Sequence, residues 1–542
     1  MGGGLPSIDK PESRNVGKFA ATTVPFLFLT VPSLWLLISV PPLWRSVDAY
    51  NQTVRPPGLV TILLHGPLYC TLSRVPLWFG YLISGSGPAE SLGHFIKHSQ
   101  LTDAGVFSLL VLQHGALWCG AVYLICAIAR TLLLRLFLAV LFASQPLFYA
   151  FAHCVGSEAL SMIVILLLAA SGVRVMLRYP DIAARDWIIF SVFLAAASLT
   201  RHINCVLAAV LPTAMIGIMI GRGLRPLAAD QNAIDSAANV RLPKAAKVWL
   251  MSIAIGVIGL IFATSATHLL CWRARTQWRS TFGYTFVWRL NFLETMQTNE
   301  RRELLDVIAA KCRLPESRQL LDLLRNSMDR NQHWEPGAFV QEAHSAASDS
   351  EMKFHSEKFD RVLNEIASGF LYPPVAPLRS VALSDFMTAT RSTESDIVQF
   401  LFVNTDYFFS HRDKMPQCSG LKTFRGPRER LAAARELSYF YWWNLLSFRA
   451  WSIFGLILFF SALFVNYKRG GENTPLILFA VSLWIVGMAM VLLNCFFAEL
   501  QPRFILPMME LVLLSLIILC GAIFRGFESP NRSFFKDTPP RC

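Results

Sequence analysis

One carboxylate and two guanidinium groups follow directly on the first apolar segment of the chain. The stretch LWRSVDAYNQTVRPPGL, residues 43–59, places Asp48 between Arg45 and Arg55 and closes on Pro-Pro-Gly-Leu. A carboxylate can take a proton from a reacting group, and a guanidinium fits phosphate oxygens through two parallel hydrogen bonds. What these side chains can reach depends on the side of a membrane on which the stretch lies.

A membrane is expected because the composition is unlike that of a soluble enzyme. Hydrophobic residues make up 54% of the 542 residues, charged residues only 16%, and the mean hydropathy is +0.44. Soluble domains carry about 25% charged residues. The net charge of +13 is attributed to basic cytoplasmic loops, and no basic soluble domain that would bind nucleic acid stands out.

The apolar residues come in blocks long enough to cross a bilayer, which takes roughly 20 residues of helix. We therefore predict an all-α polytopic membrane protein with about ten transmembrane helices. The expected spans are residues 19–41, 104–128, 136–152, 157–177, 186–200, 203–221, 247–270, 451–467, 474–494 and 503–524. The first should remain as a signal anchor, and the fifth and sixth could instead form one long helix broken at Arg201-His202.

Basic residues in the short loops predict the orientation of the spans. One side collects Lys10, Arg14, Lys18, Arg130, Arg135, Arg174, Arg178, Arg185, Arg222, Arg225, Arg241, Lys244, Lys247, Lys468, Arg469 and Arg525. Lys and Arg accumulate in cytoplasmic loops. Both termini are therefore predicted to be cytoplasmic, which means the plasma or inner membrane if the source is bacterial.

This orientation divides the chain into three parts. We expect an N-terminal transmembrane module at 1–271 with a first outer loop at 42–103, an extracytoplasmic domain at 272–448, and a C-terminal transmembrane module with a short cytoplasmic tail at 449–542. The first outer loop is apolar but broken by proline and glycine, which favours helices lying in the membrane interface. The 272–448 segment is polar and mostly helical in pattern. Its Cys312 and Cys418 either form a disulfide or stay free thiols.

Several polar side chains lie on the predicted outer face, at or near the ends of spans. Together with Asp48 they are Glu158, Arg201, His202, Glu499 and Arg503. Burying such groups in hydrocarbon is costly, so polar residues that gather on one face are candidates for a functional site. The alternative is that each is an interfacial residue in contact with lipid headgroups.

The order of these residues resembles the C-type, multi-span glycosyltransferases, which include protein O-mannosyltransferases and lipid A aminoarabinose transferases. VDAYNQTVRPPG is similar to the aspartate-bearing first outer loop of that superfamily, and the following span carries Gln113. SQPLFYAFAHCVGSEALSMIVILLL contains a similar Ser-Glu-x-Leu step, SLTRHINCVLAAVLP a Thr-Arg step, and QPRFILPMMELVLL an Arg-aromatic opening. Leu59-Val60 stands where relatives usually have Tyr-Pro, and 272–448 carries no motif of the superfamily.

The resemblance implies an inverting transfer of a sugar from a polyprenyl-phosphate carrier to a hydroxyl acceptor on the extracytoplasmic face. Asp48 would be the general base, and Glu158 would position the acceptor or support Asp48. Arg55, Arg201 and Arg503 would bind the phosphate of the leaving group, with His202 and Glu499 also assigned to substrate binding. The partners are then the lipid-linked sugar donor, the bilayer and an acceptor of unknown identity.

Two other functions compete with this interpretation. A transporter or flippase for a lipid-linked sugar would use the same outer arginines, and a non-catalytic scaffold would bind partners through 272–448. A metal site is not expected, although a divalent-metal requirement stays open. His94 and His98 have the spacing of zinc ligands on a helix but no evident third ligand.

Overall fold

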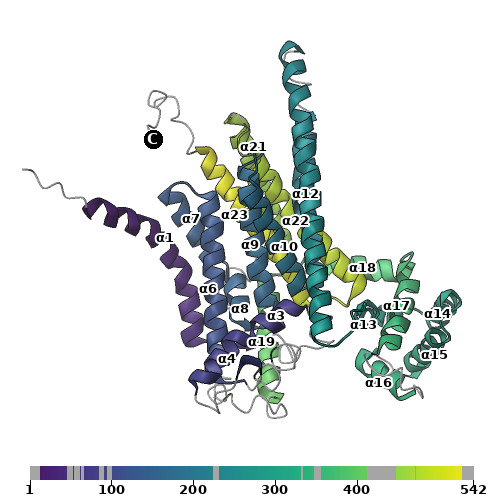
Figure 1. Cartoon of the computed structure of the whole chain (residues 1–542). Coiled ribbons are helices and arrows are strands. Elements are labelled where there is room, and N and C mark those ends of the chain that lie inside the picture. Colours follow the sequence, from purple (N-terminus) through teal and green to yellow (C-terminus); the bar gives the residue numbers. More distant parts are fainter. Residues whose placement is uncertain are drawn as a thin grey trace, which may run out of the picture.

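The computed structural model describes residues 12–44, 66–84, 101–223, 231–330, 334–346, 356–411, 447–469 and 471–527, with a few single positions between them. It shows a bundle of long helices beside a group of shorter ones (Figure 1). The bundle consists of α1 (Glu12–Ser39), α6 (Asp103–Ile128), α7 (Leu132–Ala143), α8 (Pro146–Ala152), α9 (Ser157–Leu177), α10 (Ala184–Thr200), α11 (Val210–Gly223), α12 (Gln231–Arg273), α21 (Phe448–Lys468), α22 (Thr474–Phe497) and α23 (Pro502–Phe527).

Seven helices of the described chain are long and apolar enough to cross a membrane, which confirms an all-α, multi-pass membrane protein. The pair α7 and α8, bent by 63°, would be an eighth. The predicted first and fifth spans also form helices, but α10 has 17 residues and the apolar part of α1 is only Pro25–Ser39. The ten predicted segments are therefore present in order, while the number of crossings remains a prediction.

The centre of the bundle is α23. Of an 18-residue apolar stretch in α23, 94% is buried inside the protein. In α21 the corresponding share is 17%, so this helix faces the surroundings. A helix that is apolar on every side has to be enclosed by other helices or lipid. α22, α21, α19 and α7 pack around α23, so the C-terminal module forms the core against which the N-terminal helices lie.

The chain breaks between α10 and the following helix at Arg201, where the backbone is extended with φ −153° and ψ 131°. The 3-10 helix η2 (His202–Ala209) starts there and continues into α11. Asn204 holds the break, because its side-chain amide donates to the carbonyl of Ala197 and to the hydroxyls of Thr200 and Ser161. The structure thus divides the predicted fifth and sixth spans into separate elements.

The segment predicted to be the first outer loop begins with β1 (Leu43–Trp44), which pairs in parallel with β2 (Cys154–Val155). Two short helices follow, α3 (Pro67–Leu72) and α4 (Arg74–Ile83). A Cβ atom at Gly80 of α4 would lie 2.3 Å from the carbonyl oxygen of Ala104, so only glycine allows α4 to lie this close to the start of α6. Two short helices are what a segment interrupted by proline and glycine is expected to form. Their position in the membrane interface stays a prediction.

The 272–448 segment contributes to two hydrophobic cores. One belongs to the shorter helices beside the bundle, which are α13 (Phe282–Val287), the 3-10 helix η4 (Trp288–Thr295), α14 (Thr298–Lys311), α15 (Pro315–Arg330), α16 (Pro336–Ala346) and α17 (Glu357–Leu371). The next two helices, α18 (Ala376–Ala389) and α19 (Glu394–His411), pack against the membrane bundle instead. The domain boundaries at 271/272 and 448/449 stay a prediction.

α19 contacts the entrance of the first outer loop. The ring of Phe408 stacks on that of Trp44 at 3.9 Å between centroids, and the Trp44 amide donates to Thr405. Trp44 is completely buried by these contacts. Cys312 is buried in the neighbouring core, whereas Cys418 lies outside the described residues, so their pairing stays a prediction.

Candidate functional site

Three of the predicted site residues come together at one end of the bundle. Glu158 lies in the first turn of α9, Arg201 follows the last residue of α10, and Arg503 lies in the first turn of α23. Arg201 Nη1 is 3.6 Å from Glu158 Oε1, and the two side chains are 12% and 0% exposed. At the opposite end of α9 and α10, Arg174 and Arg178 pair with Asp186. The two ends of this helix pair are therefore distinct charged sites.

The ring of Phe504 joins the two arginines of the site. The guanidinium carbon of Arg503 lies 5.0 Å from the ring centroid, and that of Arg201 lies 5.9 Å from the same centroid. A guanidinium within about 6 Å of an aromatic face is attracted by the ring quadrupole. Phe504 thus holds two positive groups near each other, and the Glu158 carboxylate lies beside one of them, Arg201.

The first outer loop packs directly against this end of the bundle. Gly66, with φ +82°, approaches the end of α10 so closely that a Cβ atom would lie 2.5 Å from the carbonyl oxygen of Thr200. The amide of Gly156, two residues before Glu158, donates to the hydroxyl of Tyr69 at 2.9 Å. Residues 66–69 of this loop are therefore anchored on both helices that supply Glu158 and Arg201.

This arrangement suits an anionic ligand. In the described part of the site two guanidinium groups lie near one carboxylate, and guanidinium groups match the oxygens of phosphate in a bidentate fork. The buried carboxylate of Glu158 costs desolvation energy, and the Arg201 guanidinium beside it offsets part of that cost. Glu158 can therefore hold Arg201 in place while Arg503 remains closer to the aromatic ring.

The remaining predicted residues divide into two groups. Asp48 and Arg55 lie outside the described residues, as do His94 and His98. His202 is exposed at the start of η2, immediately after Arg201. Among the described residues, no group of three or more His, Cys, Asp or Glu side chains could hold a metal ion.

Glu499 belongs to a different set of contacts, although it is only four residues before Arg503. Burial raises the pKa of Glu499, and the like charge of Asp385 raises it further. Arg289 and a hydrogen bond from the Asn291 side chain act in the opposite direction. Two chemically different sites therefore lie close together in the sequence, one around Glu499 in the connection before α23 and one around Arg503 in the first turn of α23.

Glu510 was not singled out from the sequence. It lies in the third turn of α23, it is 1% exposed, and neither carboxylate oxygen has a hydrogen-bond partner among the described residues. An ionisable residue inside a membrane bundle is by default a candidate for function. The signal was the single acid within PMMELVLL, an otherwise apolar run.

Two buried histidines form a second polar feature that the sequence did not reveal. His114 Nε2 lies 3.2 Å from His153 Nδ1, His114 Nδ1 lies 3.0 Å from the Ser33 hydroxyl, and His153 Nε2 lies 3.0 Å from the carbonyl oxygen of Val40. Because a carbonyl only accepts, His153 donates through Nε2, and a neutral His153 then accepts from His114. Ser33 donates to His114 in turn, so the chain of hydrogen bonds ties α1 to α6 and to the end of α8.

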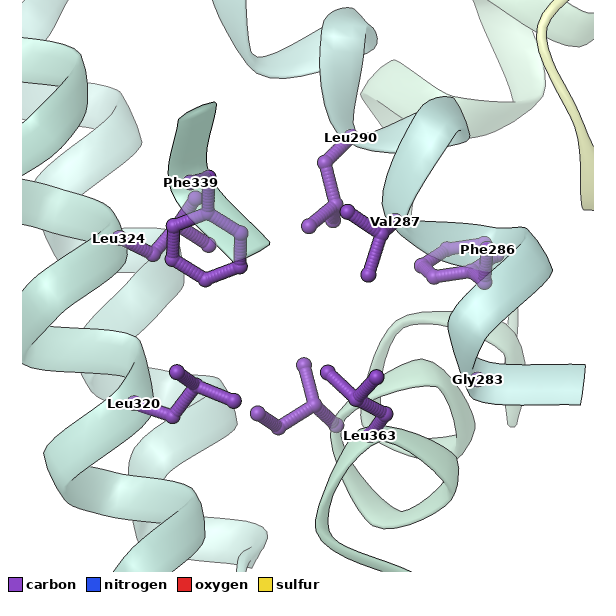
Figure 2. A pocket seen from close by; sticks show the side chains of 9 residues that line it. Gly283, Phe286, Val287, Leu290, Leu320, Leu324, Phe339 and Leu363 are labelled. Carbon is purple, nitrogen blue, oxygen red and sulfur yellow. The ribbon is translucent and has the colours of Figure 1, made fainter. Parts of the chain in front are cut away.

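A small cavity lies in the core of the shorter helices (Figure 2). Its lining consists of apolar side chains such as Phe286, Leu320 and Phe339, with Gly283 at its edge, and its volume is about 10 Å³. A cavity of this size holds about one water molecule and offers no polar side chain to it. The cavity is therefore a packing feature rather than a binding site for a substrate.

No protein-family model, no curated protein and no solved structure matches this chain. The chemistry of the site has to be inferred from the residues at the Arg201 end of the bundle and from the sequence pattern.

Proposed function

We propose that the protein is a membrane glycosyltransferase that moves a sugar from a polyprenyl-phosphate carrier to a hydroxyl acceptor on the extracytoplasmic face, with inversion. The observation that supports the proposal most is the pairing of Arg201 and Arg503 around Phe504 beside the first outer loop. The resemblance of that loop to the C-type glycosyltransferases supplies the reaction class, and Asp48 is assigned as the general base.

Each part of the site has a role in such a transfer. As the sugar leaves its carrier, negative charge develops on the polyprenyl phosphate, and guanidinium groups already in place stabilise that charge. A carboxylate takes the proton of the acceptor hydroxyl as the new bond forms. Helix ends at the membrane surface are suitable positions, because a lipid phosphate lies at that depth while its prenyl chain stays in hydrocarbon.

The proposed reaction requires this end of the bundle to face away from the cytoplasm. The excess of Lys and Arg in the short loops of the other side supports that orientation. Reporter fusions after Lys244 and after Glu351 should give opposite signals, with Lys244 on the cytoplasmic side, when activity of a reporter that works only outside is measured in intact cells. Identical signals would remove the basis for an extracytoplasmic site.

Arg503→Ala should weaken the binding of a polyprenyl phosphate by about 10–100-fold, because hydrogen bonds to charged groups contribute roughly 1.5–3 kcal/mol. Arg503→Lys should recover only part of the affinity, since an ammonium group cannot form the bidentate fork. Binding can be measured by titrating the detergent-purified protein with a sugar-free polyprenyl phosphate, which is the leaving group itself.

Arg130→Ala provides the matched control for this measurement. Arg130 is exposed in the connection between α6 and α7, away from the Arg201 site, so its loss should leave binding unchanged. If Arg503 were only a headgroup anchor, both alanine variants would bind the lipid equally well. Equal binding by Arg503→Ala and the unsubstituted protein would contradict the assigned role.

A transporter for a lipid-linked sugar is the second candidate, and Glu510 is the observation that favours it. Transporters place ionisable side chains near the bilayer midplane, and Glu510 lies about 12 Å along α23 from its first residue. A transporter would share the phosphate-binding arginines but would not need the general base. The behaviour of Asp48 variants therefore separates the two functions.

A further inference from the structure

A second polar cluster lies where three elements meet beside the bundle. Arg289 comes from η4, Asp385 from α18, and Glu499 from the connection between α22 and α23. The Arg289 side chain is 0% exposed, and its Nη1 donates to Asp385 Oδ2 at 2.5 Å, while Asp385 is 25% exposed. The cluster is thus open on the side of the carboxylates and closed behind the guanidinium.

Two of the three guanidinium nitrogens of Arg289 have no hydrogen-bond partner among the described residues. Its Nε and Nη2 atoms are buried and make no hydrogen bond to any residue that the structure describes. These two nitrogens share one edge of the guanidinium plane, which is the geometry that binds two neighbouring oxygen atoms. The side-chain oxygen of Asn291 in the same cluster is also buried without a partner among the described residues. Unsatisfied buried donors and acceptors are costly, so a group that fills them would be favoured.

The charges of the cluster limit what can fill it. The like charges of Asp385 and Glu294 both act on Glu499, so among the described residues three carboxylates stand against the one positive charge of Arg289. An anionic ligand would be repelled by the three carboxylates. A metal ion lacks a set of three ligating side chains among the described residues. Of these classes of ligand, a neutral molecule is left. It must accept hydrogen bonds from Arg289 and donate hydrogen bonds to the carboxylates.

A pair of neighbouring hydroxyl groups meets both requirements. Each hydroxyl has one proton to donate and lone pairs to accept with. We infer that Arg289, Asn291, Asp385 and Glu499 form a binding site for neighbouring hydroxyl groups of a neutral carbohydrate. Asp385 and Glu499 accept hydrogen bonds from the hydroxyls on the open side, and Arg289 donates to their oxygens from behind.

The position of the cluster assigns it a role in the proposed reaction. Arg503 is four positions after Glu499, so their Cα atoms are at most about 14 Å apart even in a fully extended chain. A carbohydrate held at Glu499 therefore lies near a donor phosphate held at Arg503. The role as acceptor site rests on the proposed function, whereas the binding of a neutral carbohydrate does not.

Saturation-transfer NMR on the detergent-purified full chain tests the site directly. The probes are the methyl glycosides of glucose, galactose and mannose at millimolar concentration, each compared with its fully O-methylated form, which accepts hydrogen bonds but cannot donate them. At least one glycoside should receive saturation from the protein, and its methylated form should not. Glu499→Gln should bind about tenfold more weakly, since a hydrogen bond to a charged group is lost.

Glu472→Gln is the matched control, because Glu472 is exposed in the connection between α21 and α22, outside the cluster. Its signal should equal that of the unsubstituted protein. All variants are compared at equal thermal stability in the same detergent, and Asp385→Asn serves as a second variant if Glu499→Gln does not fold.

The pH dependence of binding distinguishes a ligand site from a structural cluster. Binding should increase as Glu499 ionises, with a midpoint above the usual range for a glutamate, because burial and Asp385 raise its pKa. Asp385→Asn removes the like charge, so the midpoint should move to lower pH. The charged and polar groups that act on Glu499 are Asp385, Arg289, Asn291 and Glu294.

Three results would overturn the inference: no saturation of any of the three glycosides, equal binding of the methylated forms, or unchanged binding by Glu499→Gln. Because the measurement contains no polyprenyl phosphate, its failure leaves the donor-binding result at Arg503 intact. Conversely, carbohydrate binding without lipid binding would keep this site and reject the proposed transferase.

Discussion

Asp48→Asn is expected to lose at least about 10²–10⁴-fold in turnover, while membrane insertion and thermal stability stay normal. Asparagine keeps the shape of aspartate and much of its hydrogen bonding, but it cannot accept the proton of the acceptor hydroxyl. The measurement is the release of polyprenyl phosphate from a radiolabelled lipid-linked sugar by protein reconstituted in vesicles. Asp48→Ala should be equally inactive.

The structural alternative is that Asp48 pairs with Arg45 or Arg55, or caps a helix that starts near Tyr50. An exposed ion pair or a helix cap is worth about 1 kcal/mol, and asparagine caps almost as well as aspartate. This alternative predicts nearly normal turnover for Asp48→Asn, and a transporter would also survive the change. Full transfer activity would reject Asp48 as the base and make Glu158 and Glu90 the next carboxylates to test.

Arg201→Ala is expected to lower the free energy of unfolding by about 3–5 kcal/mol, because it removes the Arg201 counter-charge beside the buried Glu158 carboxylate. Adding Glu158→Gln to that variant should recover much of the loss, since a neutral side chain costs far less to bury. Thermal unfolding of the detergent-purified protein measures both variants. Arg201→Ala should also bind polyprenyl phosphate more weakly, and the double variant should not recover that binding.

Arg185→Ala is the control, because Arg185 is exposed at the other end of the same helix. A coupling energy between Arg201 and Glu158 below about 0.5 kcal/mol would mean that the two residues act independently. In that case Glu158 does not hold Arg201 in place, and the separate stability and binding effects would have to be explained by other contacts.

The membrane segments could be read from the sequence because a bilayer imposes a strong local requirement. A helix that crosses about 30 Å of hydrocarbon needs roughly 20 apolar residues, and that count does not depend on the neighbours of the helix. The same logic placed Glu158 and Arg201 at one end, since the start of one span and the end of the next must lie on the same side. Short or bent elements such as α7 and α8 were harder to count as crossings, because tilt and kinks are set by packing.

The side-chain contacts depended on the tertiary structure. Glu499 and Arg503 were assigned to one site because they are four residues apart, yet the turn before α23 directs Glu499 to Arg289 and Asp385, which are distant in sequence. Phe504 could not be recognised as the link between Arg201 and Arg503, because its position depends on how α23 packs beside the end of α10.

Composition determined that this chain is a helical membrane protein, since the transfer of apolar side chains from water to hydrocarbon is a sum over residues and ignores their partners. Whether a buried charge is paired depends instead on distances of a few ångströms between residues far apart in the chain. The pairing of Glu158 with Arg201 belongs to this second kind, and so do the edge of Arg289 and the carboxylate of Glu510 that find no hydrogen-bond partner in the described part of the chain. Only the packing of the helices fixed those distances, because the energy of a charge in a protein changes steeply with its nearest neighbours.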